Sequence, residues 1–408
     1  MIPFSPPRID QKIIDEVTDT LRSGWITTGP KTKRFEKELS AYYGSASTLC
    51  LNSATAGLEL MLRWFGVGPG DEVILPAYTY SATANVIVHC GATPVFVDIL
   101  DDFNIDPAAV RKAVTERTKA VMPVDFGGWP CDYDTINSIV RDSEVRNKFR
   151  PSTEEQRMLG RMLVLSDAAH SIGGRYKGRL TGSLADVSVF SFHAVKNLTT
   201  AEGGAVALCL PAPFDNEAVY RQLCVKSLHG QNKDALAKLQ PGNWRYDIVE
   251  PGYKMNMTDI MASIGLVELA RYESETLPKR KQVCDRYTAA FSSKPWAKTP
   301  VMQDSKGSIS SYHLYALRIN SLDESGRDEV IRRISERGVS VNVHFIPVPM
   351  MSYYRGLGYS VTDYPVTYAA YSSEISLPVY YGLTDEQLGI VTDAVVQSVE
   401  EVLLNVKS

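Results

Sequence analysis

Short runs of consecutive apolar residues recur between about residues 46 and 210 of this chain. They are rich in Val, Ile and Leu at adjacent positions, which is typical of strands that are covered on both faces of a sheet. We expect strands at Ser47–Leu51, Glu72–Leu75, Pro94–Val97, Ala120–Val124, Met162–Leu165, Val187–Phe190 and Gly204–Cys209.

Segments with helical periodicity lie between several of these runs, as at Ala56–Trp64, Thr83–His89 and Pro107–Val114. This alternation predicts an α/β fold, a mainly parallel central sheet with helices on its faces. Residues 141–161 are dense in charge and poor in apolar positions, which indicates an insertion or an exposed helix. The polar run Gln231–Gly242 ends in Pro-Gly and is predicted to be a mobile loop.

A long helical pattern covers Thr258–Glu273, where Thr258 and Asp259 are placed to cap its start. The chain has 408 residues, too many for one ordinary domain. We therefore expect a large domain over residues 1–272 and a small α+β domain over residues 273–408. The small domain is expected to contain the elements Tyr312–Ile319, Val339–His344 and Thr384–Leu404.

Composition removes several classes of function. The net charge is −4, so no basic field indicates a nucleic-acid partner. The 6 cysteines are spread along the chain without a C-x-x-C pair, which argues against a metal knuckle, a cluster or a disulfide framework. No signal peptide is evident and the apolar runs are too short to span a membrane. We expect a soluble cytoplasmic protein with no metal and no membrane partner.

Lys196 is the first candidate for chemistry. It lies in the segment Ser191-Phe-His-Ala-Val-Lys196, between the apolar runs Val187–Phe190 and Ala205–Leu208. Removal from water lowers the pKa of a lysine and leaves a free amine that can act as a nucleophile or base. A structural role is the alternative for a lysine considered alone.

The position of Asp167 favours a catalytic role for Lys196 over a structural one. Asp167 closes the strand at Met162–Leu165 and precedes Lys196 by 29 residues, about one βα unit and a return strand. Both side chains could therefore face the crevice at the strand ends, where open α/β sheets bind ligands. Pyridoxal phosphate (PLP) needs such a pair, a lysine for covalent attachment and an acid that keeps the pyridine nitrogen protonated. The alternative for Asp167 is a helix N-cap.

Two further segments suit a flat, phosphorylated cofactor. Asn52-Ser-Ala-Thr-Ala-Gly57 joins a strand to a helix, and its small residues and hydroxyls could approach a phosphate at the helix N-terminus. Tyr80 follows the strand Glu72–Leu75, where its ring could stack on the cofactor. A plain N-cap and core packing are the respective alternatives.

These four segments, in their order along the chain, resemble those of the nucleotide-sugar aminotransferases of the DegT–DnrJ–StrS group. Members of that group are PLP enzymes with the aspartate aminotransferase fold. The likeness runs nearly end to end. Its further motifs are Ser23-Gly-Trp-Ile-Thr-Thr-Gly-Pro30, Gly68-Pro-Gly-Asp-Glu-Val-Ile74, Pro94-Val-Phe-Val-Asp98, Phe103-Asn-Ile-Asp106, Gly252-Tyr-Lys-Met-Asn256, Tyr312-His-Leu-Tyr315 and Ser376-Leu-Pro-Val379.

The resemblance implies a role for each matching position. Lys196 and Asp167 correspond to the lysine that attaches the cofactor and to the partner of its ring nitrogen. The remaining cofactor-binding residues implied are Thr55, Ala56 and Ser191 at the phosphate, Tyr80 against the ring, and His170 beside the ring oxygen. Asn256 matches a residue that reaches the phosphate in the neighbouring subunit, which implies a homodimer with shared active sites. An N-cap is the alternative for Asn256.

The implied reaction moves an amino group, from L-glutamate by family likeness, to a nucleotide-linked keto-sugar. The small residues of Asp125-Phe-Gly-Gly128 favour a 4-keto-6-deoxy sugar on UDP or dTDP, and a 3-keto sugar stays open. Two further alternatives are a sugar dehydratase, which would carry His in place of Lys196, and a regulator that only binds sugar nucleotides. The chain departs from the family at two positions. Relatives often have His where this chain has Asp125, near the expected substrate end of the site, and often have His where this chain has Pro349.

Overall fold

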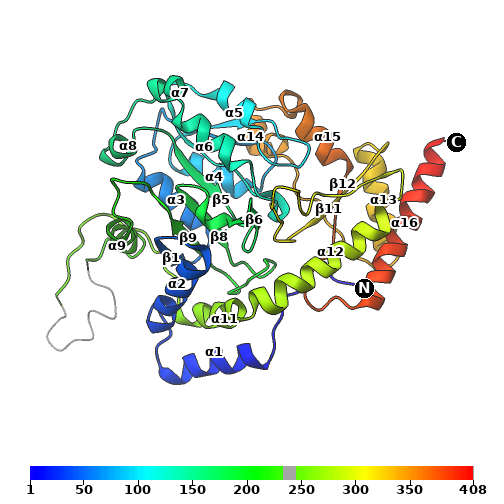
Figure 1. Ribbon diagram of the computed structural model, residues 1–408, viewed down its shortest axis with the longest axis horizontal. Helices are drawn as coiled ribbons and strands as arrows, with labels where there is room; N and C mark the ends of the chain where they lie inside the picture. The colour runs from blue at the N-terminus through cyan, green and yellow to red at the C-terminus, as the bar shows by residue number, and fades with distance from the viewer. Residues whose placement is uncertain (233–244, 408) are drawn as a thin grey trace.

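The computed structural model describes residues 1–232 and 245–407. Most of the predicted loop Gln231–Gly242 lies outside the described residues. The ribbon in Figure 1 divides into a large sheet with helices around it and a smaller sheet beside the C-terminal helix α16 (Asp385–Lys407). The long helical run through α11 (Asp259–Ala270) and α12 (Leu277–Phe291) connects the two regions.

The large sheet has seven strands in the order β1-β9-β8-β5-β4-β2-β3. Strand β9 is antiparallel to both neighbours, whereas the other pairs are parallel, which confirms the mainly parallel sheet. Its strands are β1 Ser47–Leu51, β2 Glu72–Pro76, β3 Thr93–Val97, β4 Thr118–Val121, β5 Leu163–Asp167, β8 Val187–Ser191 and β9 Gly204–Leu208. All seven predicted strands are present. Strand β4 ends earlier than expected, at Val121, because Pro123 has no N–H to continue the ladder.

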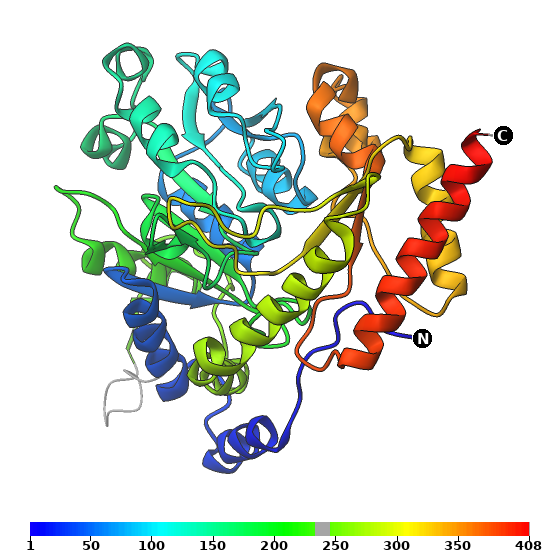
Figure 2. The ribbon, with the colours of Figure 1, turned by 45° about the vertical axis from the view of Figure 1, so that its right-hand side comes forward.

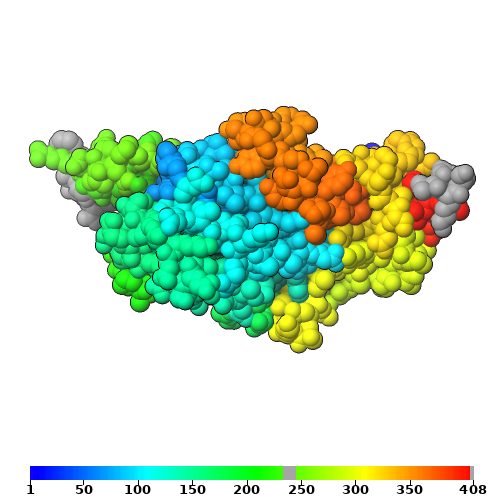
Figure 3. Space-filling model, turned by 90° about the horizontal axis from the view of Figure 1, so that it is seen from above, coloured from blue at the N-terminus to red at the C-terminus, as the bar shows by residue number. Residues whose placement is uncertain are grey.

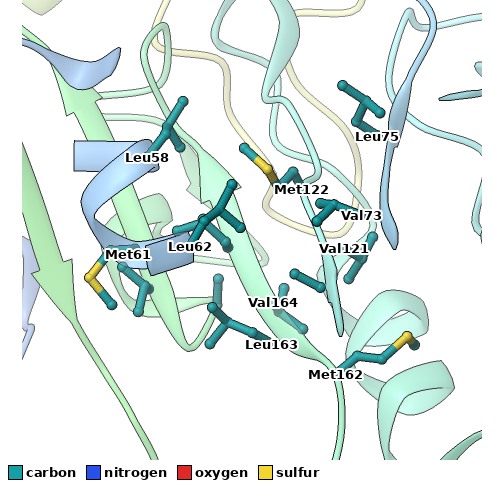
Figure 4. Packing of buried hydrophobic residues seen from close by; sticks show 14 of the residues in the cluster. Leu58, Met61, Leu62, Val73, Leu75, Val121, Met122, Met162, Leu163 and Val164 are labelled. Atoms are coloured by element: carbon teal, nitrogen blue, oxygen red, sulfur yellow. The ribbon is translucent and has the colours of Figure 1, made fainter. Parts of the chain in front are cut away.

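Helices cover the large sheet and bury its apolar positions. Helix α3 (Ala54–Trp64) begins where the Ser53 side chain accepts a hydrogen bond from the Ala56 N–H, a standard N-cap. Figure 4 shows Leu62 of α3 near Leu163 on β5, with Leu58 farther along α3, in a core where all three are almost fully buried. Full burial of one such side chain stabilises the fold by roughly 1.5–3 kcal/mol.

The other helices of this region confirm the predicted alternation. They are α4 Ser81–His89, α5 Pro107–Ala113, α6 Tyr133–Arg141 and α9 Asn216–Lys226. The charged segment 141–161 forms two short helices, α7 (Ser143–Lys148) and α8 (Glu154–Leu159). The short strands β6 (Arg175–Tyr176) and β7 (Arg179–Leu180) form a separate two-stranded sheet.

Helix α11 is capped differently from the prediction. Thr258 does cap it, through the N–H of Met261. Asp259 instead accepts hydrogen bonds from the backbone N–H groups of Gly29 and Thr32, at 2.8 and 2.9 Å, and so caps helix α2 (Pro30–Tyr43). A buried carboxylate thus joins α2 to α11, which also packs on α1 (Gln11–Ser23).

The smaller sheet has the order β10-β11-β12, with β10 at Ala297–Lys298, β11 at Tyr315–Ile319 and β12 at Glu374–Leu377. Helix α13 (Glu324–Glu336) packs against α16 over this sheet. The expected element Val339–His344 is neither a helix nor a regular strand, because it forms only single bridges, from Val339 to Ile2 and from Asn342 to Ser376. The predicted strand Tyr312–Ile319 starts late because Tyr312 has a left-handed φ of 56°.

A segment between β11 and β12 crosses back to the large sheet. It carries α14 (Ser352–Gly356) and α15 (Pro365–Ser373), drawn in orange across the upper face in Figure 3. The Tyr354 hydroxyl donates to the Asn85 carbonyl oxygen Oδ1 at 2.6 Å, and the Phe96 ring packs edge-on against Tyr354. Figure 2 shows the N-terminus beside the C-terminal helix α16, and Ile2 belongs to the hydrophobic core of the smaller sheet.

Each sheet has its own hydrophobic core, but Val348 and Tyr354 belong to that of the large sheet and Ile2 to that of the smaller one, so the boundary between residues 272 and 273 stays a prediction. Short 3-10 turns lie at Phe126–Gly128, Thr181–Ser183, Val348–Met350 and Val361–Asp363, and a π-turn at Tyr272–Thr276 precedes α12. In the part of the chain described, no helix is both long and apolar enough to cross a membrane. Residues 1–232 and 245–407 also hold no group of three or more His, Cys, Asp or Glu side chains suited to a metal ion.

Candidate active site

A cavity of about 380 Å³ opens where the carboxyl ends of the parallel strands meet. Asp167 ends β5, and Lys196 follows the neighbouring parallel strand β8. Both side chains line the cavity, as do Thr55 after β1 and Tyr80 after β2. The fold therefore brings together residues that are far apart in the sequence, as the strand pattern predicted.

The Lys196 amine faces this cavity from a tight turn in which its N–H donates to the His193 carbonyl at 2.9 Å. Burial lowers the pKa of Lys196 to about 8, although the negative charge of Asp167 acts in the opposite direction. No ion pair joins Lys196 to a carboxylate within the described residues. The amine is thus partly shielded from solvent, largely neutral at mildly alkaline pH, and free to form a bond.

The Asp167 carboxylate is held in place by two hydrogen bonds. Its Oδ2 accepts from the Thr83 hydroxyl at 2.8 Å, and its Oδ1 accepts from the Ala169 N–H at 3.2 Å. Burial raises the pKa of Asp167, which these two donors and the charge of Lys196 oppose. No helix starts at Ala168, so the carboxylate does not cap one. It is placed instead as a buried acceptor for a cationic ligand.

His170 is fixed in one tautomer beside the same cavity. Its Nδ1 accepts a hydrogen bond from the Gly127 N–H at 3.2 Å. Burial and the charge of Lys196 lower the pKa of His170 well below its ordinary value, so the ring is neutral. A neutral ring with an accepting Nδ1 carries its proton on Nε2. His170 therefore offers a hydrogen-bond donor to whatever fills the cavity.

The segment predicted to hold a phosphate lies at the start of α3. Ser53 and Thr55 line the cavity, and so does Ser191 at the end of β8. Ala56 is not among the lining residues, and its N–H already bonds to Ser53. A β-carbon on Gly204 would lie 2.4 Å from the Ala54 nitrogen. Only glycine therefore lets β9 approach this turn so closely.

Tyr80 and Asn256 differ in their relation to the cavity. Tyr80 stands at the N-cap of α4 with 62% of its surface exposed, and its ring lies 5.7 Å from that of Phe345. Asn256 is not among the lining residues, because its side-chain amide donates to the Thr28 hydroxyl at 2.6 Å. Thr258 is the N-cap of α11, so Asn256 does not take that alternative role.

Asp125 does not reach the cavity, contrary to its expected place near the substrate. The side chain is fully buried. Its carboxylate accepts hydrogen bonds from the Cys131 N–H, the Tyr133 hydroxyl and the Ser171 hydroxyl, at 2.9, 2.9 and 2.7 Å. Burial raises the pKa of Asp125 to about 6. Its contacts assign it to the packing behind the cavity wall.

Among the polar and aromatic lining residues that were not proposed as site residues from the sequence, five lie outside the strand ends of the large sheet. They are Phe4, Ser5, His313, His344 and Phe345. They come from the chain start and from segments near the smaller sheet, and they reach the cavity only through tertiary packing. The sequence pointed to two of them only through neighbouring motifs. His313 lies in the motif Tyr312-His-Leu-Tyr315, and His344 directly precedes the run Phe345-Ile-Pro-Val-Pro349.

The donor set fits PLP. The partly buried Lys196 amine and the buried Asp167 carboxylate line one cavity, and no ion pair joins them within the described residues. His170 offers a neutral donor, and small and hydroxyl residues stand at the N-terminus of α3. When bound, PLP acts as an electron sink that stabilises the carbanion formed in transamination.

Comparisons with known proteins agree with this geometry. Residues 7–147 and 156–396 match the DegT/DnrJ/EryC1/StrS aminotransferase family. The spore coat polysaccharide biosynthesis protein SpsC of Bacillus subtilis is 40% identical over 400 residues, which cover 97% of this chain and 96% of that protein.

Solved structures point the same way. Spr1654 from Streptococcus pneumoniae, which is named a sugar aminotransferase, is 47% identical in its PMP form, with a TM-score of 0.94 over 98% of this chain and 100% of that one. Its PLP form is 46% identical, with a TM-score of 0.93 over 98% and 99% of the two chains. Helicobacter pylori PseC, an aminotransferase of pseudoaminic acid biosynthesis, is 27% identical with a TM-score of 0.84 over 98% and 99%.

The match extends across both sheets and includes the segments that carry Lys196 and Asp167. Relatives with PLP and PMP forms agree with a cavity that is lined by both the Lys196 amine and the Asp167 carboxylate. The chain therefore belongs to the DegT/DnrJ/EryC1/StrS aminotransferase family and is a PLP-dependent sugar aminotransferase.

Proposed function

We propose that this enzyme transfers an amino group from L-glutamate to a keto-sugar linked to a nucleoside diphosphate. The observation that carries the proposal is that Lys196, which has no ion-pair partner among the described residues, lines the same cavity as Asp167, because a protein that only bound sugar nucleotides would need no such amine. A dehydratase of this family would carry His at position 196, so the lysine favours amino transfer.

In this proposal Lys196 and Asp167 are the catalytic residues. Lys196 holds the cofactor covalently between turnovers. With the cofactor bound, the freed Lys196 amine would carry the proton that leaves the donor α-carbon, and PLP would supply the electron sink for the carbanion. Asp167 keeps the ring nitrogen protonated, with Thr83 and Ala169 fixing its carboxylate. The same steps in reverse deliver the amino group to the sugar, so ping-pong kinetics follow.

The remaining assignments concern cofactor binding. Thr55, Ala56 and Ser191 are proposed to contact the phosphate, and Thr55 and Ser191 have the more direct support because they line the cavity. Tyr80 is proposed to stack on the ring, for which its exposed face is suited. His170 is proposed to donate its Nε2 proton to the ring oxygen.

Asn256 is proposed to act in the active site of a second subunit, which makes a homodimer the functional unit. The absence of its side chain from the lining of this chain's own cavity is compatible with that assignment. Mixing Lys196→Ala subunits with Asn256→Ala subunits tests the proposal. Shared sites predict that heterodimers regain activity in one of their two sites, whereas unshared sites predict no gain over the separate variants.

The acceptor is proposed to be a 4-keto-6-deoxy sugar on UDP or dTDP, and the reaction to take place in the cytoplasm. The relatives support an amino-sugar product, because SpsC is named for spore coat polysaccharide and PseC for pseudoaminic acid. Such products feed surface polysaccharides, including lipopolysaccharide.

The decisive experiment separates the two half-reactions. Purified holoenzyme is mixed with L-glutamate alone, and the visible absorbance of the lysine-bound cofactor and the 2-oxoglutarate released are both measured. The resulting PMP enzyme is then offered 4-keto and 3-keto sugars on UDP and dTDP, with product mass as the readout. Stoichiometric 2-oxoglutarate and one aminated sugar nucleotide are expected. No amination of any sugar nucleotide would overturn the proposal.

A further inference from the structure

His344 faces the active-site cavity from the side of the smaller sheet, although nothing in the proposed chemistry uses it. Its imidazole lines the cavity together with Lys196, whose charge acts on it. The Phe4 ring stacks on the imidazole with centroids 5.5 Å apart and an angle of 26° between the planes. The ring is therefore held at a fixed position beside the reacting amine.

Two buried side chains of β12 hold the other edge of the ring. The Nδ1 of His344 is hydrogen-bonded to the Ser376 hydroxyl at 2.9 Å, and that hydroxyl donates to Glu374. The Glu374 carboxylate also accepts the backbone N–H of His344 at 3.0 Å. Ser376 and Glu374 are both fully buried, so neither competes with solvent for these bonds. Among the described residues, the recorded bonds of His344 use its N–H and Nδ1, which leaves Nε2 on the cavity side.

The charge of the ring decides which ligand group it suits. Burial and the charge of Lys196 lower the pKa of His344 to about 3, so the ring is neutral at physiological pH. Neutral imidazole forms ordinary hydrogen bonds with a hydroxyl group, whereas a carboxylate is bound more strongly by a cationic partner. His344 is thus matched to a polyhydroxylated substrate and poorly matched to the carboxylates of an amino-acid donor.

We propose that His344 determines acceptor specificity through a hydrogen bond that its Nε2 accepts from a hydroxyl group of the sugar, and that Ser376, which accepts from the His344 Nδ1–H, and Glu374 are positioning residues for its ring. This inference rests on the proposed amino transfer to a sugar and adds the residue that recognises that sugar. It assigns a function to the smaller sheet, whose strand β12 supplies the support.

Two substitutions of His344 test the roles of its two ring nitrogens separately. His344→Gln keeps a polar group near the position of Nε2, whereas His344→Asn keeps one near Nδ1 and loses the reach into the cavity. The PMP form of each variant is given either the sugar nucleotide that the wild-type enzyme aminates or 2-oxoglutarate, which has no hydroxyl group. Both acceptors use the same cofactor and the same Lys196, so their ratio isolates acceptor recognition.

We expect His344→Asn to raise the KM for the sugar nucleotide by about 10-fold, as for the loss of one buried hydrogen bond, with kcat/KM for 2-oxoglutarate within about 2-fold of wild type. His344→Gln should recover most of the sugar KM. Ser376→Ala, which leaves His344 in place without its anchor, should show a smaller rise confined to the sugar.

Equal losses with both acceptors, or no loss with either, would overturn the inference, as would a His344→Gln enzyme no better than His344→Asn. If a variant does not fold, the Ser376→Ala ratio still decides the question. Failure of the proposed function looks different, because wild-type enzyme would then aminate no sugar nucleotide. In that case 2-oxoglutarate would still react normally with the wild-type PMP enzyme.

Discussion

The free amine of Lys196 gives a quantitative prediction for cofactor attachment. Only the unprotonated amine can bond to the cofactor aldehyde, so the attachment rate should follow the titration of Lys196. Burial sets the pKa of this group to about 8, against 10.5 for an ordinary lysine. The perturbation is therefore simple: the pH at which PLP-free enzyme is mixed with PLP.

The magnitude follows from the two pKa values. With a pKa of about 8, roughly 9% of Lys196 is unprotonated at pH 7 and roughly 91% at pH 9, so the rate rises about 10-fold. An ordinary lysine would be only about 0.03% unprotonated at pH 7, some 300-fold less than Lys196. The sign is set by desolvation, which disfavours the charged ammonium form.

Stopped-flow absorbance at saturating PLP measures the attachment rate constant directly. A lysine derivative with a blocked α-amine, reacted under the same conditions, corrects for the ionisations of PLP itself. Lys196→Ala reports any signal from non-covalent binding. Asp167→Asn offers a second test, because the charge of Asp167 raises the Lys196 pKa and its removal should shift the midpoint to lower pH.

A midpoint near that of an ordinary lysine would refute the reasoning, because it would mean that Lys196 is solvated. A rate that does not change with pH would refute it as well. An Asp167→Asn midpoint equal to the wild-type value would show that the two groups do not interact across the cavity.

Three further predictions concern the scaffold of the site. Gly204→Ala should weaken PLP binding at least about 10-fold in a fluorescence titration, because its β-carbon would lie 2.4 Å from the Ala54 nitrogen. The control Gly389→Ala, at an open position of α16, should leave PLP binding unchanged. Equal PLP binding by the two variants would contradict this prediction. Asp186→Asn should lower the free energy of unfolding by about 3–5 kcal/mol in denaturant titration, because it leaves the buried Arg161 without its charged partner. Glu154→Gln, which removes a surface ion pair, should change that free energy by under about 0.5 kcal/mol. Burial raises the pKa of Asp125 from 3.8 to about 6, so its contribution to stability is fully present below about pH 4 and is lost as the pH rises through 6; the stability of wild type relative to Asp125→Asn should fall by about 3 kcal/mol over that interval, and a constant difference would contradict the burial argument.

The large sheet could be predicted from the sequence because its strands are buried on both faces and read as continuous apolar runs. Lys196 and Asp167 could be predicted as site residues for the same reason. Each lies at or after the end of a strongly apolar strand, and neighbouring parallel strands bring their carboxyl ends together. The predicted capping role of Asp259 failed because local sequence does not reveal that α2 starts beside α11.

The far wall of the cavity was harder to predict. His344 ends the segment Val339–His344, which forms only single bridges because its start pairs with Ile2 and its later part pairs with Ser376. Phe4 reaches the site from the chain start and touches His344, more than 300 positions later. No periodicity records such contacts, since they depend on how the two sheets pack together.

The central claim is that Lys196 is the residue that carries the cofactor and the amino-transfer chemistry. Borohydride reduction of the holoenzyme, followed by peptide mass spectrometry, tests it most directly, with a second sample treated with L-glutamate before reduction. The account predicts one modified lysine, Lys196, whose labelling is lost after L-glutamate treatment. Modification of a different lysine, or labelling that L-glutamate does not remove, would contradict it.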